Sequence, residues 1–292
     1  MYYIVYGIFY LLSLLPWRII YIISDFAAFL LYRVFKYRKP VVMNNLLIAF
    51  PEKTETEREK IAKEFYSNFT DNFIEVIKLL SISKKELNKR FQCNYEVMND
   101  LYDSGINIQL LLSHQFNWEI ANPAYAANLQ YPFVVVYMGI ANETFKKLFY
   151  KIRSRYGSLL VGAWQFRKDF APISKDRFVL ALVGDQSPVD ACYWLPFFGK
   201  LTAFVKGPEK TARMYKTAIV MGNCYKLKRG HYKTELTLLT TDPNSLPHGE
   251  ITKKMAAFME DSIRQHPSNY LWSHRRWKRE YNEEHHQKDL LV

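Results

Sequence analysis

Short apolar runs alternate with amphipathic segments beyond Asn107, and this alternation constrains the fold more than any other feature. The apolar runs span residues 108–112, 133–137, 178–183 and 218–221, and each has the length of a buried strand. The segments 143–155, 205–215 and 250–265 have the apolar spacing of helices. Strands that alternate with helices are typical of parallel sheets covered by helices. The sequence therefore predicts an α/β fold with a mostly parallel central sheet flanked by helices.

The segment after Pro51 carries a helix-start signal. Thr54 is followed three residues later by Glu57, which is the pattern of a capping box. Apolar residues then recur at helical spacing from Ile61 to Ile77. We expect a long helix that begins at this point.

The N-terminal segment is almost uncharged. The first seventeen residues contain no Asp, Glu, Lys or Arg, and between Arg18 and Phe35 only Asp25 and Arg33 are charged. A secretory signal peptide needs a basic start and a small-residue cleavage site, and neither is visible. Pro16 divides the apolar stretch into two pieces, each shorter than the ~20 residues of a membrane span. We therefore expect a retained pair of apolar helices.

A basic cluster follows this pair and suggests what the helices contact. Arg33, Lys36, Arg38 and Lys39 suit the anionic surface of a cytoplasmic leaflet, and the preceding Tyr and Trp residues suit a membrane interface. The expected organisation is an N-terminal hydrophobic membrane anchor over residues 1–38, monotopic or with a single anchor, and a main domain over residues 39–292. The alternative is a hydrophobic helix pair buried in a soluble core.

Charge and cysteine content narrow the possible partners. Forty Lys and Arg against 28 Asp and Glu give a net charge of +12, which favours acidic partners such as nucleic acid, an anionic membrane, an acidic protein or a phosphorylated substrate. The basic run 274–279 lacks a recognition-helix or zinc pattern, so we expect no nucleic acid partner. The three cysteines have no paired spacing, which argues against disulfides and a metal site.

His114 leaves the first predicted strand, and Glu119 lies five positions further on, where the next helix should start. In open α/β sheets, ligands bind beyond the carboxyl ends of the strands. A strand-to-helix turn would let the two side chains meet, whereas on one continuous helix they would lie roughly 140° apart. A neutral imidazole removes a proton from a hydroxyl, and a carboxylate fixes its tautomer and stabilises the imidazolium. The spacing therefore permits a His–carboxylate dyad.

A second strand exit carries further polar residues. Asp185 and Gln186 directly follow the apolar run that ends near residue 184, so we expect them to border the same cleft. The alternative is a turn that holds an Asx hydrogen bond.

Several sequence blocks, in one order along the chain, carry a family resemblance. They are residues 14–18, 44–52, 113–119 (Ser-His-Gln-Phe-Asn-Trp-Glu), 153–157, 184–187, 195–199, 206–208, 212–213 and 270–278. In these blocks the chain resembles the HtrB-type family of bacterial lipid A late acyltransferases. This family is distantly related to glycerolipid acyltransferases, which share the His-x4-acid motif. The agreement runs almost from end to end.

The resemblance implies an acyltransferase catalytic domain over residues 39–292 that uses no cofactor and no metal. It implies an enzyme at the cytoplasmic face of the bacterial inner membrane, which moves a fatty acyl chain from an acyl thioester to a hydroxyl of a lipid A precursor. The donor would be an acyl carrier protein, with coenzyme A as the alternative. The net charge of +12 would attract both the acidic carrier and a phosphorylated membrane glycolipid.

The resemblance also implies roles for individual residues. His114 would be the general base and Glu119 its orienting partner. The expected substrate-binding residues are Asn117, Arg153, Arg155, Asp185, Gln186 and Arg213. Backbone amides after Asn117, or one of the first two arginines, would stabilise an oxyanion, and Arg213 would bind an acceptor phosphate. The alternatives are a solvated helix face for Arg153 and Arg155 and an ordinary ion pair for Arg213.

Two positions depart from the family pattern, Gln115 beside the histidine and Ser187 after the Asp-Gln pair. They leave the acyl chain length and the acceptor open, but not the reaction class. One alternative is therefore an acyltransferase for another membrane lipid, such as an aminolipid, a pigment or a phosphatidylinositol mannoside. The alternative from another class is a catalytically silent lipid-binding protein.

Overall fold

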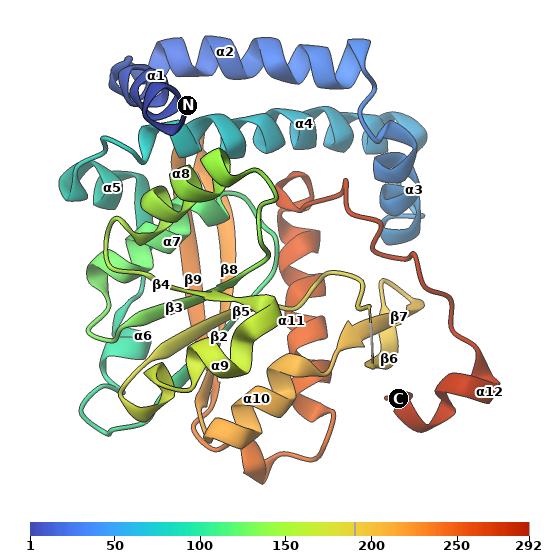
Figure 1. Ribbon diagram of the computed structural model, residues 1–292. Helices are drawn as coiled ribbons and strands as arrows, with labels where there is room; N and C mark the ends of the chain where they lie inside the picture. Colours follow the sequence, from blue (N-terminus) through green and yellow to red (C-terminus); the bar gives the residue numbers. More distant parts are fainter. Residues whose placement is uncertain (190, 292) are drawn as a thin grey trace.

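The computed structural model describes residues 1–189 and 191–291. At its centre lies a seven-stranded sheet with the strand order β1-β9-β8-β2-β5-β3-β4 (Figure 1). The strands are β1 (Phe91–Cys93), β2 (Ile108–Leu112), β3 (Phe133–Tyr137), β4 (Leu159–Gly162), β5 (Val179–Val183), β8 (Ala218–Lys228) and β9 (His231–Thr240). All neighbours run parallel except β8 and β9, which are antiparallel. The predicted α/β fold with a mostly parallel sheet is confirmed.

The apolar runs of the sequence form the central strands. β2 and β3 have the predicted bounds, and β5 begins one residue later than expected. β8 continues past Met221 to Lys228, because its second half pairs with β9. β9 was missed by the sequence prediction because buried and exposed residues alternate along it, so it has no continuous apolar run.

Helices make up most of the remaining structure. They are α1 (Tyr2–Leu14), α2 (Trp17–Phe29), α3 (Lys39–Ala49), α4 (Glu55–Lys78), α5 (Lys84–Arg90), α6 (Glu96–Asn99), α7 (Trp118–Asn128), α8 (Glu143–Ser154), α9 (Phe166–Phe170), α10 (Gly207–Tyr215), α11 (Glu250–Gln265) and α12 (Glu283–His286). The long helix predicted after Pro51 is α4. The capping box is present, because the Glu57 amide donates to the Thr54 hydroxyl and the Glu57 carboxylate accepts from the Thr54 amide.

Helices cover both faces of the sheet. Successive strand residues point to opposite faces, so an apolar strand presents apolar side chains on both sides. Ile108 and Leu110 of β2 pack in one apolar cluster with residues of α7 such as Ile120. Leu111 between them points the other way and packs in a second cluster with Met255 of α11.

A hairpin of β6 (Cys192–Phe197) and β7 (Lys200–Val205) follows β5 outside the main sheet. Its two turn residues, Phe198 and Gly199, have φ angles of 52° and 73°. Positive φ at both central residues is the mark of a type I′ turn, which matches the twist of the two strands. The Phe198 ring is buried and packs edge-on against Phe50, so tertiary packing holds a residue type that rarely adopts this conformation.

The N-terminal segment forms two helices that break at Pro16, as predicted, and they lie as a layer outside α4 (Figure 1). One side of each helix is buried, with Ser13, Ile20 and Ser24 as its buried residues. The other side exposes large apolar side chains, among them Ile4, Ile8, Leu11, Leu14, Ile19, Ile22, Ile23, Phe26 and Phe29. Among the described residues, no single helix has both the length and the apolarity to cross a membrane. The segments 2–14 and 17–34 reach that length and composition only as a pair, bent by 113°.

Candidate active site

The register of the sheet brings His114 and Asp185 together. Leu112 at the end of β2 lies opposite Val183 at the end of the neighbouring parallel strand β5. Each functional side chain lies two residues further along its own strand exit. The two therefore meet at the same level of the sheet, with His114 Nδ1 2.7 Å from Asp185 Oδ1.

This contact sets the protonation of the imidazole. Asp185 is buried, and burial alone would raise its pKa, but the charge and hydrogen bond of His114 outweigh burial and lower the pKa. Burial also opposes the charged form of His114, yet Asp185 and, more weakly, Glu119 raise its pKa. A carboxylate at Nδ1 accepts the proton of that nitrogen, which leaves the lone pair on Nε2. The His114 side chain is 23% exposed, so Nε2 is the atom that a substrate can approach.

Gln186 occupies the other side of the imidazole. Its Nε2 lies 3.3 Å from His114 Nε2, and the residue directly follows Asp185 in the chain. Asp185 and Gln186 therefore both border the site of His114. A side-chain amide here places a hydrogen-bond donor beside the nitrogen that holds the lone pair.

Residues of the segment 270–276 hold the stretch of chain that carries Asp185. In the sequence, only the family resemblance of block 270–278 indicated them. The Ser187 amide donates to His274 Nε2 at 2.9 Å. Burial lowers the pKa of His274 to about 4, with the positive charges of Arg276 and His114 acting in the same direction. Arg276, which belongs to the basic run 274–279, is buried and donates from Nη1 to the Ala203 carbonyl. Tyr270 is also buried, and burial together with the charge of Asp185 raises its pKa.

The sequence predicted that Glu119 is the hydrogen-bond partner of His114, but in the structure that partner is Asp185. Glu119 lies in the first turn of α7 and accepts from Arg153 of α8, at 3.1 Å from Nε and 2.5 Å from Nη2. The spacing alone did not indicate this outcome, because Asp185 reaches Nδ1 from a neighbouring strand 71 positions away in sequence. Glu119 therefore acts on His114 through its charge and not through direct contact.

Three expected substrate-binding residues are engaged in structural contacts instead. Asn117 is fully buried, and its Oδ1 accepts from the amides of Glu119 and Ile120, so those amides are not free to bind an oxyanion. Arg155 donates to the Leu79 carbonyl. Arg213 pairs with Glu209 on its own helix and donates to three backbone carbonyls, which are those of Pro243, Leu246 and Pro247. This is the ordinary ion pair named as its alternative.

The surroundings of His114 are apolar. The Trp118 ring packs nearly perpendicular to the imidazole, with 5.5 Å between the ring centroids. Phe73 of α4 packs against Trp118 and is 44% exposed. Val183 and Met138 are exposed at the ends of β5 and β3, which is the edge of the sheet that carries His114. An exposed apolar surface beside an ionisable pair suits a substrate with a long hydrocarbon chain.

Fold and site together define an α/β protein with a histidine–carboxylate pair at the carboxyl edge of its parallel sheet. The family model of the bacterial lipid A biosynthesis acyltransferases matches residues 1–279, so the chain belongs to this family. A lipid A biosynthesis acyltransferase of Haemophilus influenzae is 23% identical over 275 residues, which cover 91% of this chain and 84% of that protein. The chain is therefore an acyltransferase of lipid A synthesis, and the resemblance expected from the sequence blocks is confirmed.

Proposed function

We propose that the chain transfers a fatty acyl group from an acyl thioester, carried by an acyl carrier protein, to a hydroxyl of a lipid A precursor. The observation that carries this proposal is the pairing of His114 with the buried Asp185, because it leaves the lone pair on Nε2, in a partly exposed ring beside an apolar surface. Such a nitrogen has the position and the protonation state of a general base.

The reaction follows from that geometry. Nε2 of His114 takes the proton of the acceptor hydroxyl as the oxygen attacks the thioester carbonyl, and a tetrahedral oxyanion forms. When this adduct collapses, the C–S bond breaks, the ester remains on the acceptor, and the thiolate takes the proton back from Nε2. Asp185 stays ionised and stabilises the imidazolium between the two proton transfers.

Two further side chains have roles in this proposal. Gln186 lies close enough to Nε2 to donate a hydrogen bond to the attacking oxygen or to the oxyanion. Arg153 is held by Glu119 through Nε and Nη2, and its remaining N–H groups are available to an anionic part of a substrate. Glu119 thus orients Arg153 and adds negative charge near His114, while Asp185 orients the imidazole.

We also propose that α1 and α2 hold the enzyme on the cytoplasmic face of the bacterial inner membrane in a monotopic arrangement. The outward sides of both helices are apolar, while their inward sides pack on α4. The basic residues from Arg33 to Lys39 directly follow the outward apolar side. This order suits insertion to the depth of the head groups with lysine and arginine at the anionic surface.

Mass spectrometry of envelope lipids from cells with and without the gene tests the proposal. One acyl mass on lipid A should be lost with the gene and return with the wild-type chain, but not with His114→Ala. If the acyl mass is missing from an aminolipid, a pigment or a phosphatidylinositol mannoside instead, the acceptor is that lipid. If His114→Ala restores the acyl mass fully, His114 is not the base.

A further inference from the structure

Glu75 of α4 is a buried carboxylate beside the active site that takes no part in the steps proposed above. It is 1% exposed and accepts hydrogen bonds from three neutral groups: the Tyr21 hydroxyl at 3.0 Å, Asn117 Nδ2 at 2.8 Å and the Tyr232 hydroxyl at 2.9 Å. Burial, with the nearby charge of Asp71, raises the pKa of Glu75 to about 7, although the hydrogen bonds act in the opposite direction. A buried carboxylate is costly unless its oxygens are hydrogen-bonded, and here donors from three separate elements converge on it, with Asn117 of the catalytic segment among them.

The contact with Asn117 has a chemical consequence. A side-chain amide has a donor end and an acceptor end, and its neighbours decide which way it points. An ionised carboxylate only accepts hydrogen bonds, so Glu75 attracts the donor end, Nδ2. The acceptor end, Oδ1, then faces the start of α7 and receives the amides of Glu119 and Ile120, at 3.0 and 3.1 Å.

The orientation of Asn117 matters to the site because of what lies on either side of it. His114 precedes it by three residues, and Glu119, which holds Arg153, follows it by two. A reversed amide would place N–H groups against the N–H groups of α7 and would release this helix start. Phe116 is held independently, since Asn269 donates to its carbonyl and accepts its amide. Asn117 is therefore the point at which Glu75 acts on the segment.

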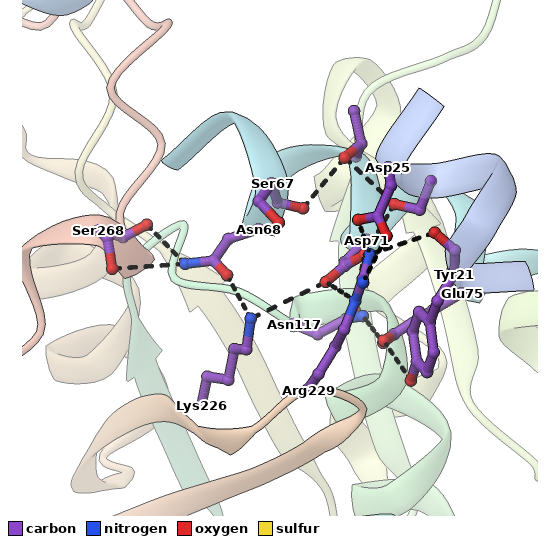
Figure 2. A network of polar contacts seen from close by, with 12 residues as sticks. Tyr21, Asp25, Ser67, Asn68, Asp71, Glu75, Asn117, Lys226, Arg229 and Ser268 are labelled. Atoms are coloured by element: carbon purple, nitrogen blue, oxygen red, sulfur yellow. Dashed lines mark hydrogen bonds and ion pairs between the residues drawn. The ribbon is translucent and has the colours of Figure 1, made fainter. Parts of the chain in front are cut away.

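We propose that Glu75 is a positioning residue of the acyl-transfer site, which orients Asn117 and so fixes the start of α7 and the Glu119–Arg153 pair beside His114. This inference rests on the proposed function of His114. Figure 2 shows Glu75 between Asn117 and Tyr21 of α2, so the same carboxylate also joins the outer helix layer to the catalytic segment.

The role of Glu75 can be tested by exchanging the hydrogen-bond donor on Asn117 and the acceptor on Glu75, since Asn and Asp, and likewise Glu and Gln, differ little in volume. Asn117→Asp still caps α7 but sets two carboxylates against each other, and we expect it to lower kcat by about 10- to 100-fold with a much smaller change in KM. The defect relative to wild type should be larger near pH 8 than near pH 6, because two close carboxylates share a proton only when the pH is low enough. Glu75→Gln in the Asn117→Asp background restores a donor opposite an acceptor and should recover most of kcat and remove the extra pH dependence.

Asp71→Asn in the Asn117→Asp background is the matched control. It also removes a buried carboxylate from α4, but Asp71 bonds to Ser24 and Arg229 and not to Asn117, so it should not rescue. Thermal melting of each variant, with kcat per folded enzyme, separates positioning from loss of fold. The proposal is overturned if folded Asn117→Asp has wild-type kcat, if Glu75→Gln fails to rescue it, or if Asp71→Asn rescues it equally. His114→Ala in the same assay reports on the proposed function itself, because activity in that variant would refute the base and leave the Glu75 result to be read separately.

Discussion

Two groups of buried carboxylates flank the segment 113–118, and they differ in whether a polar atom is left for a substrate. At the sheet edge, Asp185 binds one nitrogen of His114, and the other nitrogen lies in a partly exposed ring. Beneath α2, protein donors bind every carboxylate oxygen of Asp71 and Glu75, as Figure 2 shows for most of these contacts. The same residue types therefore serve chemistry in one place and shape in the other.

The difference follows from where each group lies in the fold. Asp185 follows a parallel strand, at the edge of the sheet where strand ends meet, and the imidazole that it binds is partly exposed. Asp71 and Glu75 lie on the face of α4 that α2 covers, and Arg229 from the β8–β9 turn closes that space by bonding to both Asp71 and Asp25. The open ionisable pair should govern activity directly. Within the closed network, Asp71 should govern stability, and Glu75 should act on the site only through Asn117.

The largest expected effect separates the two groups directly. His114→Ala should lower kcat by about 10²–10⁴, the range for loss of a general base, because no other group holds a lone pair at that position. The truncation also leaves the buried Asp185 without its partner, so kcat is compared per folded enzyme. Asp71→Asn should leave kcat per folded enzyme nearly unchanged and lower stability by roughly 1–3 kcal/mol, because Arg229 and Ser24 lose a charged partner. Steady-state kinetics and thermal denaturation of both variants check this comparison, and wild-type kcat in folded His114→Ala would contradict it.

The next effect concerns which carboxylate controls the base. Asp185→Asn should lower kcat on the order of 10², because an amide at Nδ1 no longer fixes the tautomer that leaves Nε2 free. His114 must be neutral to act as a base, and the Asp185 carboxylate raises the pKa of His114. Removing the charge of Asp185 should therefore lower that pKa and move the acidic limb of kcat/KM to lower pH. Glu119→Gln should move the limb in the same direction by less. A larger shift in Glu119→Gln than in Asp185→Asn would reverse the assignment of partners.

The sequence predicted those parts of the structure that depend on neighbours along the chain. The capping box at Thr54 and Glu57, the strand 108–112 and the break at Pro16 all rest on local patterns, and all are confirmed. The partner of His114 does not follow from a local pattern, because Asp185 reaches the imidazole only through the pairing of β2 with β5. The motif spacing favoured Glu119, and no local pattern records which strands are neighbours.

The boundary expected at residue 38 also depends on distant contacts. α1 and α2 resemble a separate anchor in composition, yet Lys78 of α4 donates to the Ser13 and Leu15 carbonyls, and Ser24 bonds to Asp71. The division into residues 1–38 and 39–292 stays a prediction. These contacts lead us to expect that removing the helices would leave buried charges of α4 without partners.

The two sides of α2 offer a test with a smaller expected effect, which compares its exposed outward side with its buried inward side. Ile22 and Phe26 are each 64% exposed on the outward side, whereas Ile20 is 1% exposed on the inward side. Ile22→Ser with Phe26→Ser should weaken binding to anionic vesicles by at least about 10-fold and leave the melting temperature nearly unchanged. Ile20→Ser should instead cost about 2–4 kcal/mol in stability. Vesicle sedimentation and thermal denaturation measure both, and unchanged sedimentation of the outward variant would argue against attachment through α2.

The smallest expected effect concerns the donor that approaches the open side. α8 carries Arg153 in the site and also exposes Lys146, Lys147 and Lys151, which would attract an acidic carrier protein. At equal acyl chain length, kcat/KM should be higher for the carrier-linked thioester than for acyl coenzyme A. Lys147→Glu should reduce that preference by a few-fold, whereas Lys168→Glu on α9 should not.

Salt gives the supporting measurement, since the reach of surface charges falls to about 8 Å near physiological ionic strength. Both donors are acidic, so a loss of rate with salt does not by itself identify the carrier. The ratio of the two kcat/KM values identifies the carrier. Rising salt should weaken the attraction of α8 for a docked carrier protein more than its attraction for coenzyme A. Equal use of both donors by the wild-type chain would reject carrier specificity, and it would leave the transfer of the acyl group at His114 unaffected, because that step depends on the thioester carbonyl and not on what carries the thiol.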